Sequence, residues 1–72
     1  MNYSAGKLHI RFQETPKTNC KIQVFNVMGQ QVLFAQLQNI STQHISLHQP
    51  AGIYFAVVAS GGQYQAFKIL ID

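Results

Sequence analysis

Charged residues, and acidic residues above all, are scarce in this chain. They make up 10% of the sequence, whereas about 25% is usual in soluble domains. The only carboxylate side chains are Glu14, in an expected turn, and Asp72, the last residue. Because general acid and base catalysis needs two ionisable groups held close together, this distribution argues strongly against a hydrolase with paired carboxylates. We expect no enzymatic activity and no cofactor.

Cysteine occurs once, as Cys20, so the chain cannot form an internal disulfide. The neighbouring Lys21 faces outward on the predicted strand, so we expect no cationic setting beside Cys20 of the kind that activates a catalytic thiol. A lone cysteine on a strand is more often a small core residue. We therefore expect Cys20 to be buried and inert.

Long apolar runs are also missing, since no stretch approaches the roughly 18 residues that span a membrane. The first residues lack the basic segment and apolar run of a secretory signal peptide. If the module is exported, we expect its signal to lie in a longer precursor or to be the module itself. The 72 residues make one domain at most. We take residues 1–72 as a single module.

What the sequence does contain is alternation of apolar and polar residues. In residues 7–13 it puts Leu8, Ile10 and Phe12 on one face of a strand. Similar patterns predict strands at 20–27, 30–36, 43–47, 53–59 and 64–71. The segment 53–59 is apolar on both faces, which favours a central strand. No segment of adequate length has helical spacing. About six to seven short strands predict an all-β fold, a small antiparallel sandwich.

Two interruptions of the apolar pattern predict hairpins. Asn26 is favoured at the first position of a type I turn, and Gly29 can take the left-handed conformation that closes a bulged hairpin. A residue with a Cβ atom at Gly29 would cost about 1 kcal/mol. Gly61 and Gly62 predict a second, tight hairpin.

Histidine is the most plausible metal ligand in the sequence, but its spacing is unsuitable. His44 and His48 are four residues apart, which on a strand leaves them about 13 Å apart. A zinc ion needs ligands that converge to roughly 2 Å from it. We expect no metal site.

A basic stripe is the best candidate for a functional surface. Lys7, His9 and Arg11 share the polar face of the first predicted strand, and Lys21 is expected on the neighbouring strand. Such a stripe can hold a phosphate or an acidic sugar. The alternative is that these charges protect an edge strand against aggregation. The net charge of +3 falls short of the dense basic clusters that bind nucleic acid.

Three segments in order, VFNVMGQQV, PAGIYFAVV and GGQYQAFKILI, carry a family resemblance that covers essentially the whole chain. The chain resembles the C-terminal sorting domain (type A) of the type IX, or Por, secretion system, which is found at the ends of secreted proteins of Bacteroidota. The residues that match the family pattern in order are Asn26, Gly29, Val32, Gly52, Tyr54 and Lys68.

The resemblance implies an immunoglobulin-like β-sandwich that acts, in its folded state, as a sorting signal. It implies recognition by the outer-membrane machinery after the cargo has reached the periplasm, and cleavage by a sortase-like peptidase. The cargo is then released or attached to an anionic lipopolysaccharide at the cell surface. We expect Tyr54 to pack in the fold. We expect the secretion machinery to recognise two elements. These are the Gly29 hairpin and the closing strand with Lys68, Ile69, Leu70 and Ile71.

Two other functions fit the same pattern. The first is a carbohydrate-binding or adhesion module at the cell surface, in which the basic stripe acts together with Tyr64 or Tyr3. The second is a weak homodimer formed through an unpaired edge strand.

Overall fold

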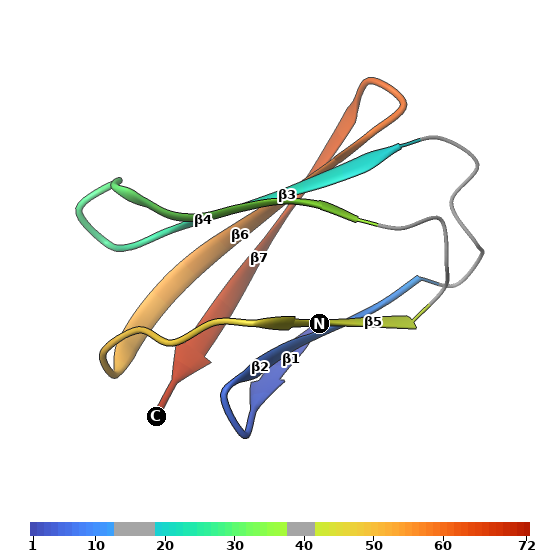
Figure 1. Ribbon diagram of the computed structural model, residues 1–72. Helices are drawn as coiled ribbons and strands as arrows, with labels where there is room; N and C mark the ends of the chain where they lie inside the picture. Colours follow the sequence, from blue (N-terminus) through green and yellow to red (C-terminus); the bar gives the residue numbers. More distant parts are fainter. Residues whose placement is uncertain (13–18, 38–41) are drawn as a thin grey trace.

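The computed structural model describes residues 1–12, 19–37 and 42–72 (Figure 1). Among these residues no helix is long and apolar enough to cross a membrane. The turn expected around Glu14 and Pro16 lies outside the described residues. The described residues form seven β-strands: β1 (Asn2–Ser4), β2 (Lys7–Arg11), β3 (Cys20–Phe25), β4 (Gln31–Leu37), β5 (Thr42–Ser46), β6 (Gly52–Ser60) and β7 (Gln63–Ile71).

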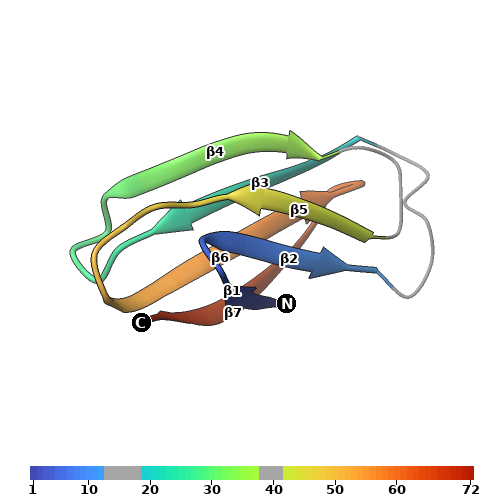
Figure 2. The ribbon, with the colours of Figure 1, turned by 60° about the horizontal axis from the view of Figure 1, so that its bottom comes forward.

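The strands form two sheets, and every strand pair is antiparallel. The small sheet has the order β1-β2-β5, and the large sheet has the order β4-β3-β6-β7. Figure 2 shows them as stacked layers, with β2 and β5 over β3 and β6. On one side, β1 contacts β7. The predicted fold class, an all-β antiparallel sandwich, is confirmed.

The core lies between the two sheets. Leu8 and Ile10 of the small sheet are buried on the face that alternation predicted. Each buried Leu, Ile or Val side chain contributes about 1.5–3 kcal/mol. No buried side-chain nitrogen or oxygen of the described residues lacks a hydrogen-bond partner. The other buried apolar residues are Cys20, Ile22, Val24, Leu37, Leu47, Tyr54, Ala56, Val58, Ile69 and Ile71.

The first strand, β1, was not predicted. Its three residues are too few to show a period, and it is recognisable only from its partner, since Tyr3 pairs with Leu8. The Tyr3 hydroxyl donates a hydrogen bond of 2.6 Å to the carbonyl oxygen of Leu47. This bond ties β1 to the segment that follows β5.

The hairpin between β3 and β4 forms as predicted, although β3 ends at Phe25 because Asn26 begins the turn. The Gly29 amide donates to the Asn26 carbonyl oxygen at 3.0 Å. The Asn26 side-chain oxygen accepts from the amides of Met28 and Gln30, both at 3.0 Å. Gly29 has a φ of 82°, in the left-handed region. The ladder shifts register beside Val24 and Phe25, so the hairpin carries the expected bulge.

The second predicted hairpin joins β6 to β7. Gly61 and Gly62 have φ values of 56° and 81°, as a two-residue type I′ turn requires. The turn sets a ladder that runs from Ser60 opposite Gln63 to Gly52 opposite Ile71. β6 therefore lies between β3 and β7, as expected of a central strand.

Tyr54 joins the core to the turn that precedes β6. Its side chain is only 6% exposed, and its hydroxyl donates to the carbonyl oxygen of Pro50 at 2.7 Å. A tyrosine hydroxyl that bonds to the backbone a few residues upstream is also a feature of immunoglobulin-type sandwiches. Tyr54 thus orients the chain where it enters the central strand.

Replacing Gly29 tests the backbone requirement of the first hairpin. A Cβ atom at Gly29 would meet no other atom within 4 Å, so only the backbone conformation opposes a side chain. We expect Gly29→Ala to lower the free energy of unfolding by about 1 kcal/mol in urea denaturation. Gly29→Asn should cost less, because Asn tolerates the left-handed region. Equal stability of Gly29→Ala and the parent chain would contradict this account.

Replacing Tyr54 tests the hydroxyl bond alone. Tyr54→Phe keeps the ring in the core and removes the donor to Pro50, so it should cost about 1 kcal/mol of unfolding free energy. The matched control is Tyr64→Phe, since Tyr64 is 73% exposed, and it should change stability by less than about 0.5 kcal/mol. Thermal and urea unfolding measure both variants, and similar losses in the two would refute the role given to the hydroxyl.

Candidate functional site

The family-pattern residues, although spread along the sequence, lie at one end of the large sheet. Phe25, which precedes the Gly29 hairpin, pairs with Phe55 of β6. Phe55 in turn pairs with Lys68 of β7. The hairpin tip, the beginning of β6 and the end of β7 are therefore neighbours, as Figure 1 shows on its left side.

The closing strand presents only half of its residues to solvent. Ile69 and Ile71 are buried in the core, whereas Lys68 and Leu70 point outward. Val32 of β4 is half-buried and packs against the core. On the folded domain, a partner can reach Lys68 and Leu70 but not the two isoleucines.

The same end of the molecule exposes large apolar side chains. At the hairpin tip, Val27 and Met28 are 69% and 80% exposed, and Leu70 is 62% exposed. Ile53 and Phe55 lie on the same outer face as Leu70, because Ile53 and Leu70 are register partners. Clustered exposed apolar residues of this kind mark interaction sites. We call Val27, Met28, Ile53, Phe55 and Leu70 the apolar end surface.

Sequence reasoning did not recognise this surface. The apolar pattern of residues 53–59 correctly predicted a central strand, but Ile53 and Phe55 remain exposed because no described element covers the outer face of the large sheet. The signal in the sequence was that apolar residues occupy outward-facing positions on both β6 and β7. Strand pairing was needed to bring them together.

The basic stripe is partly corrected by the structure. Lys7, His9 and Arg11 lie together on the outer face of β2, but Lys21 is on β3 in the large sheet. The prediction for Lys21 was wrong because β2 pairs with β1 and β5 and not with the next strand in the chain. For the same reason β2 is not an edge strand, so the alternative of edge protection is also wrong.

In place of Lys21, the structure brings β1 and β5 to the stripe. His44 of β5 is directly opposite His9, and the two ring centroids are 4.5 Å apart in an edge-to-face arrangement. Ser4 Oγ of β1 lies 3.0 Å from His9 Nε2. Thr42 is opposite Arg11. Sequence reasoning missed His44 as a neighbour of His9, because the two are far apart in the chain.

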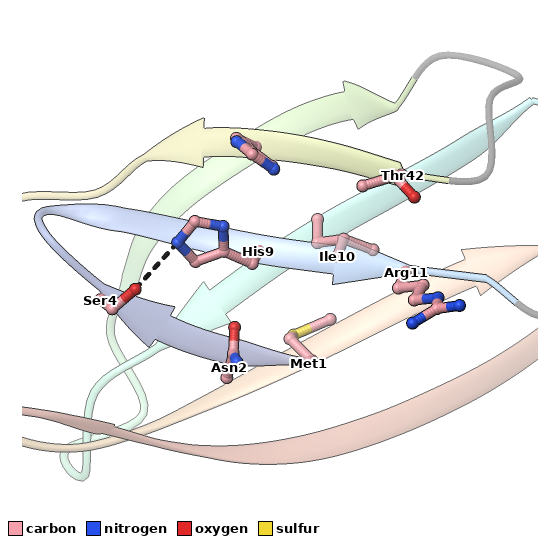
Figure 3. A pocket seen from close by; sticks show the side chains of 8 residues that line it. Met1, Asn2, Ser4, His9, Ile10, Arg11 and Thr42 are labelled. Carbon is pink, nitrogen blue, oxygen red and sulfur yellow. Dashed lines mark hydrogen bonds between the residues drawn. The ribbon is translucent and has the colours of Figure 1, made fainter.

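These residues surround a hollow of about 410 Å³ on the outer face of the small sheet. Figure 3 shows Ser4, His9 and Arg11 around it, with the contact between Ser4 and His9 dashed. Among the described residues, none that lines it is acidic. We call this site the basic hollow, and its lining residues are Met1, Asn2, Ser4, His9, Ile10, Arg11, Thr42 and His44.

The structure separates the two histidines whose spacing was weighed as a metal site. His44 faces His9, whereas the ring of His48 lies against Gly6, where an added Cβ atom would come within 2.9 Å of it. Within residues 1–12, 19–37 and 42–72, no three or more His, Cys, Asp or Glu residues group as metal ligands would.

The tyrosines considered for carbohydrate binding do not share the surface of the stripe. Tyr64 pairs with Ala59 in the large sheet, so it lies on the other side of the sandwich from His9 and Arg11. The Tyr3 hydroxyl is already bonded to Leu47. A binding surface that combines the stripe with either tyrosine ring is therefore not formed.

Comparison with known proteins agrees with the motif pattern. The family described as the secretion system C-terminal sorting domain matches residues 2–72, essentially the whole chain. Comparisons with the curated proteins and with the solved structures found no match. The chain belongs to the family of C-terminal sorting domains of the type IX secretion system.

Proposed function

We propose that this domain is a folded sorting signal. The type IX machinery recognises it and exports the attached N-terminal cargo across the outer membrane. The observation that carries the proposal is the match of residues 2–72 to the sorting-domain family. Membership of this family implies interaction with the type IX machinery and attachment to an N-terminal cargo. It also implies export to the cell surface or the extracellular space.

The proposed route has two steps beyond what family membership implies. The cargo and its sorting signal first reach the periplasm and are then moved together across the outer membrane. A sortase-like peptidase next removes the sorting signal from the cargo. Residues 1–72 are in this account a single module of a longer precursor, and the module itself performs no chemistry. Its contribution is to present a surface that the machinery binds.

We propose that the type IX machinery recognises the apolar end surface together with Lys68. Asn26 and Gly29 shape the hairpin and thereby project Val27 and Met28 into solvent. Large apolar side chains that are exposed in the free domain can be buried by a partner, and a few such residues carry most of the affinity of an interface. Some residues of the family pattern would then be needed for folding, and others for contact with the machinery.

Tyr54, Ile69 and Ile71 belong to the residues that are needed for folding. All three are buried, and Ile71 pairs with Gly52 while Ile69 pairs with Tyr54. They hold the end of β7 against β6, so that Leu70 and Lys68 face outward in a defined register. Loss of these residues would remove the read surface indirectly, by releasing the closing strand.

Fusion to a reporter tests the export function. A periplasmic reporter followed by residues 1–72 should reach the medium or the cell surface in a type IX-competent bacterium. The same fusion without β7 should stay in the periplasm, because the core loses Ile69 and Ile71 and the large sheet loses an outer strand. Fractionation with an activity assay of the reporter measures both. Periplasmic retention of both fusions would refute the proposal.

Charge substitutions test whether the apolar end surface is read. Met28→Asp and Leu70→Asp should each lower export of the reporter by about tenfold without loss of folding in circular dichroism. The matched control is Tyr64→Asp, which changes an equally exposed residue at the opposite end of β7. Equal export by all three folded variants would show that another surface is read.

A further inference from the structure

We propose that the basic hollow on the small sheet binds an anionic saccharide, that is, a sugar that carries a carboxylate or phosphate group. This inference is separate from the sorting function and depends on a different surface. The basic hollow lies on the outer face of β1, β2 and β5, whereas the apolar end surface belongs to the large sheet.

Positive charge in the hollow comes from the middle strand of the small sheet. Arg11 lines it, and Lys7 lies on the same face of β2, opposite Ser46 of β5 and Ser4 of β1. A guanidinium can bind a carboxylate or a phosphate through two parallel hydrogen bonds. Because β2 is flanked by strands on both sides, protection of a sheet edge does not explain these charges.

The histidine pair adds hydrogen-bonding groups beside Arg11. The ring centroids of His9 and His44 lie 4.5 Å apart in an edge-to-face arrangement. An imidazole N–H can donate a hydrogen bond to a carboxylate or phosphate oxygen. The side chains that face the pair from β1 and β5 are uncharged (Asn2, Ser4, Thr42 and Ser46), and those from β2 are Lys7 and Arg11.

No acidic side chain competes for these cations within the described residues of the small sheet. Asp72, the acidic residue that the described part of the chain contains, follows the end of β7 in the large sheet. On the described residues of this sheet, an incoming anion therefore meets cations and neutral hydrogen-bonding groups. The net charge of +3 favours its approach over longer distances.

The remaining lining favours a sugar over a bare oxyanion. Asn2, Ser4 and Thr42 offer hydroxyl and amide groups that both donate and accept hydrogen bonds, which suits sugar hydroxyls. The volume of about 410 Å³ falls in the range of small-molecule sites and exceeds what one phosphate fills. A membrane surface fits less well, because the described residues of this face form no exposed apolar row that could insert into lipid.

An NMR titration of the 72-residue chain tests the proposal, with trigalacturonate as the anionic probe. We expect it to shift the backbone signals of β1, β2 and β5, because its carboxylates bind beside Arg11 and the histidine pair. Maltotriose, a neutral trisaccharide, should cause no shifts. Inorganic phosphate should bind more weakly, because it cannot reach the hydroxyl and amide groups together with the cations.

Matched variants locate the binding. Arg11→Gln should weaken trigalacturonate binding by about tenfold, and His44→Gln should weaken it less than Arg11→Gln does. Lys21→Gln removes the same net charge as Arg11→Gln but from the large sheet, and it should leave the affinity unchanged. Two-dimensional spectra of each variant establish that it is folded.

Three results would overturn the inference. The first is the absence of shifts in β1, β2 and β5. The second is phosphate binding as tight as trigalacturonate binding, which would assign the hollow to simple oxyanions. The third is an equal loss of affinity in Lys21→Gln and Arg11→Gln, which would indicate general attraction by net charge. None of these measurements involves the secretion machinery, so failure here leaves the sorting function untouched.

Discussion

The burial of one sheet against the other is the interaction on which the rest of this domain depends. A chain of 72 residues with a single cysteine has no internal disulfide to stabilise it, and a domain of this size buries only about 60% of the surface that its unfolded chain exposes. Leu8 and Ile10 from the small sheet must therefore pack against Ile22, Val24 and Ala56 from the large one. Because the inner faces supply the core, the outer faces can vary without loss of the fold.

The two outer faces have opposite chemical character. The large sheet carries exposed apolar side chains such as Phe55 and Leu70 on its outer face. The solvated face of an antiparallel sheet is usually polar. The small sheet carries His9, Arg11 and His44 with hydroxyl and amide neighbours. The sandwich presents these surfaces on opposite sides, where two partners could be engaged independently.

Much of the fold could be predicted from local patterns. Alternation placed Leu8 and Ile10 inside, and the chemistry of Asn26 and Gly29 predicted a hairpin that the hydrogen bonds confirm. These features depend on residues close together in the chain. The strand β1 could not be predicted, because three residues carry no period. The position of Lys21 was wrong because the polar face of a strand does not reveal which strand will lie beside it.

The sequence by itself determined which residues of β2 and β3 face the core, where the two hairpins turn, and the family to which the chain belongs. Only the tertiary structure decided which strands share a sheet. An alternating pattern satisfies burial equally well with any partner of the same length, so the pairing of β2 with β5 follows from the packing of the whole sandwich. That pairing put His44 beside His9 and created the basic hollow. The pairing of β3, β6 and β7 assembled the apolar end surface in the same way.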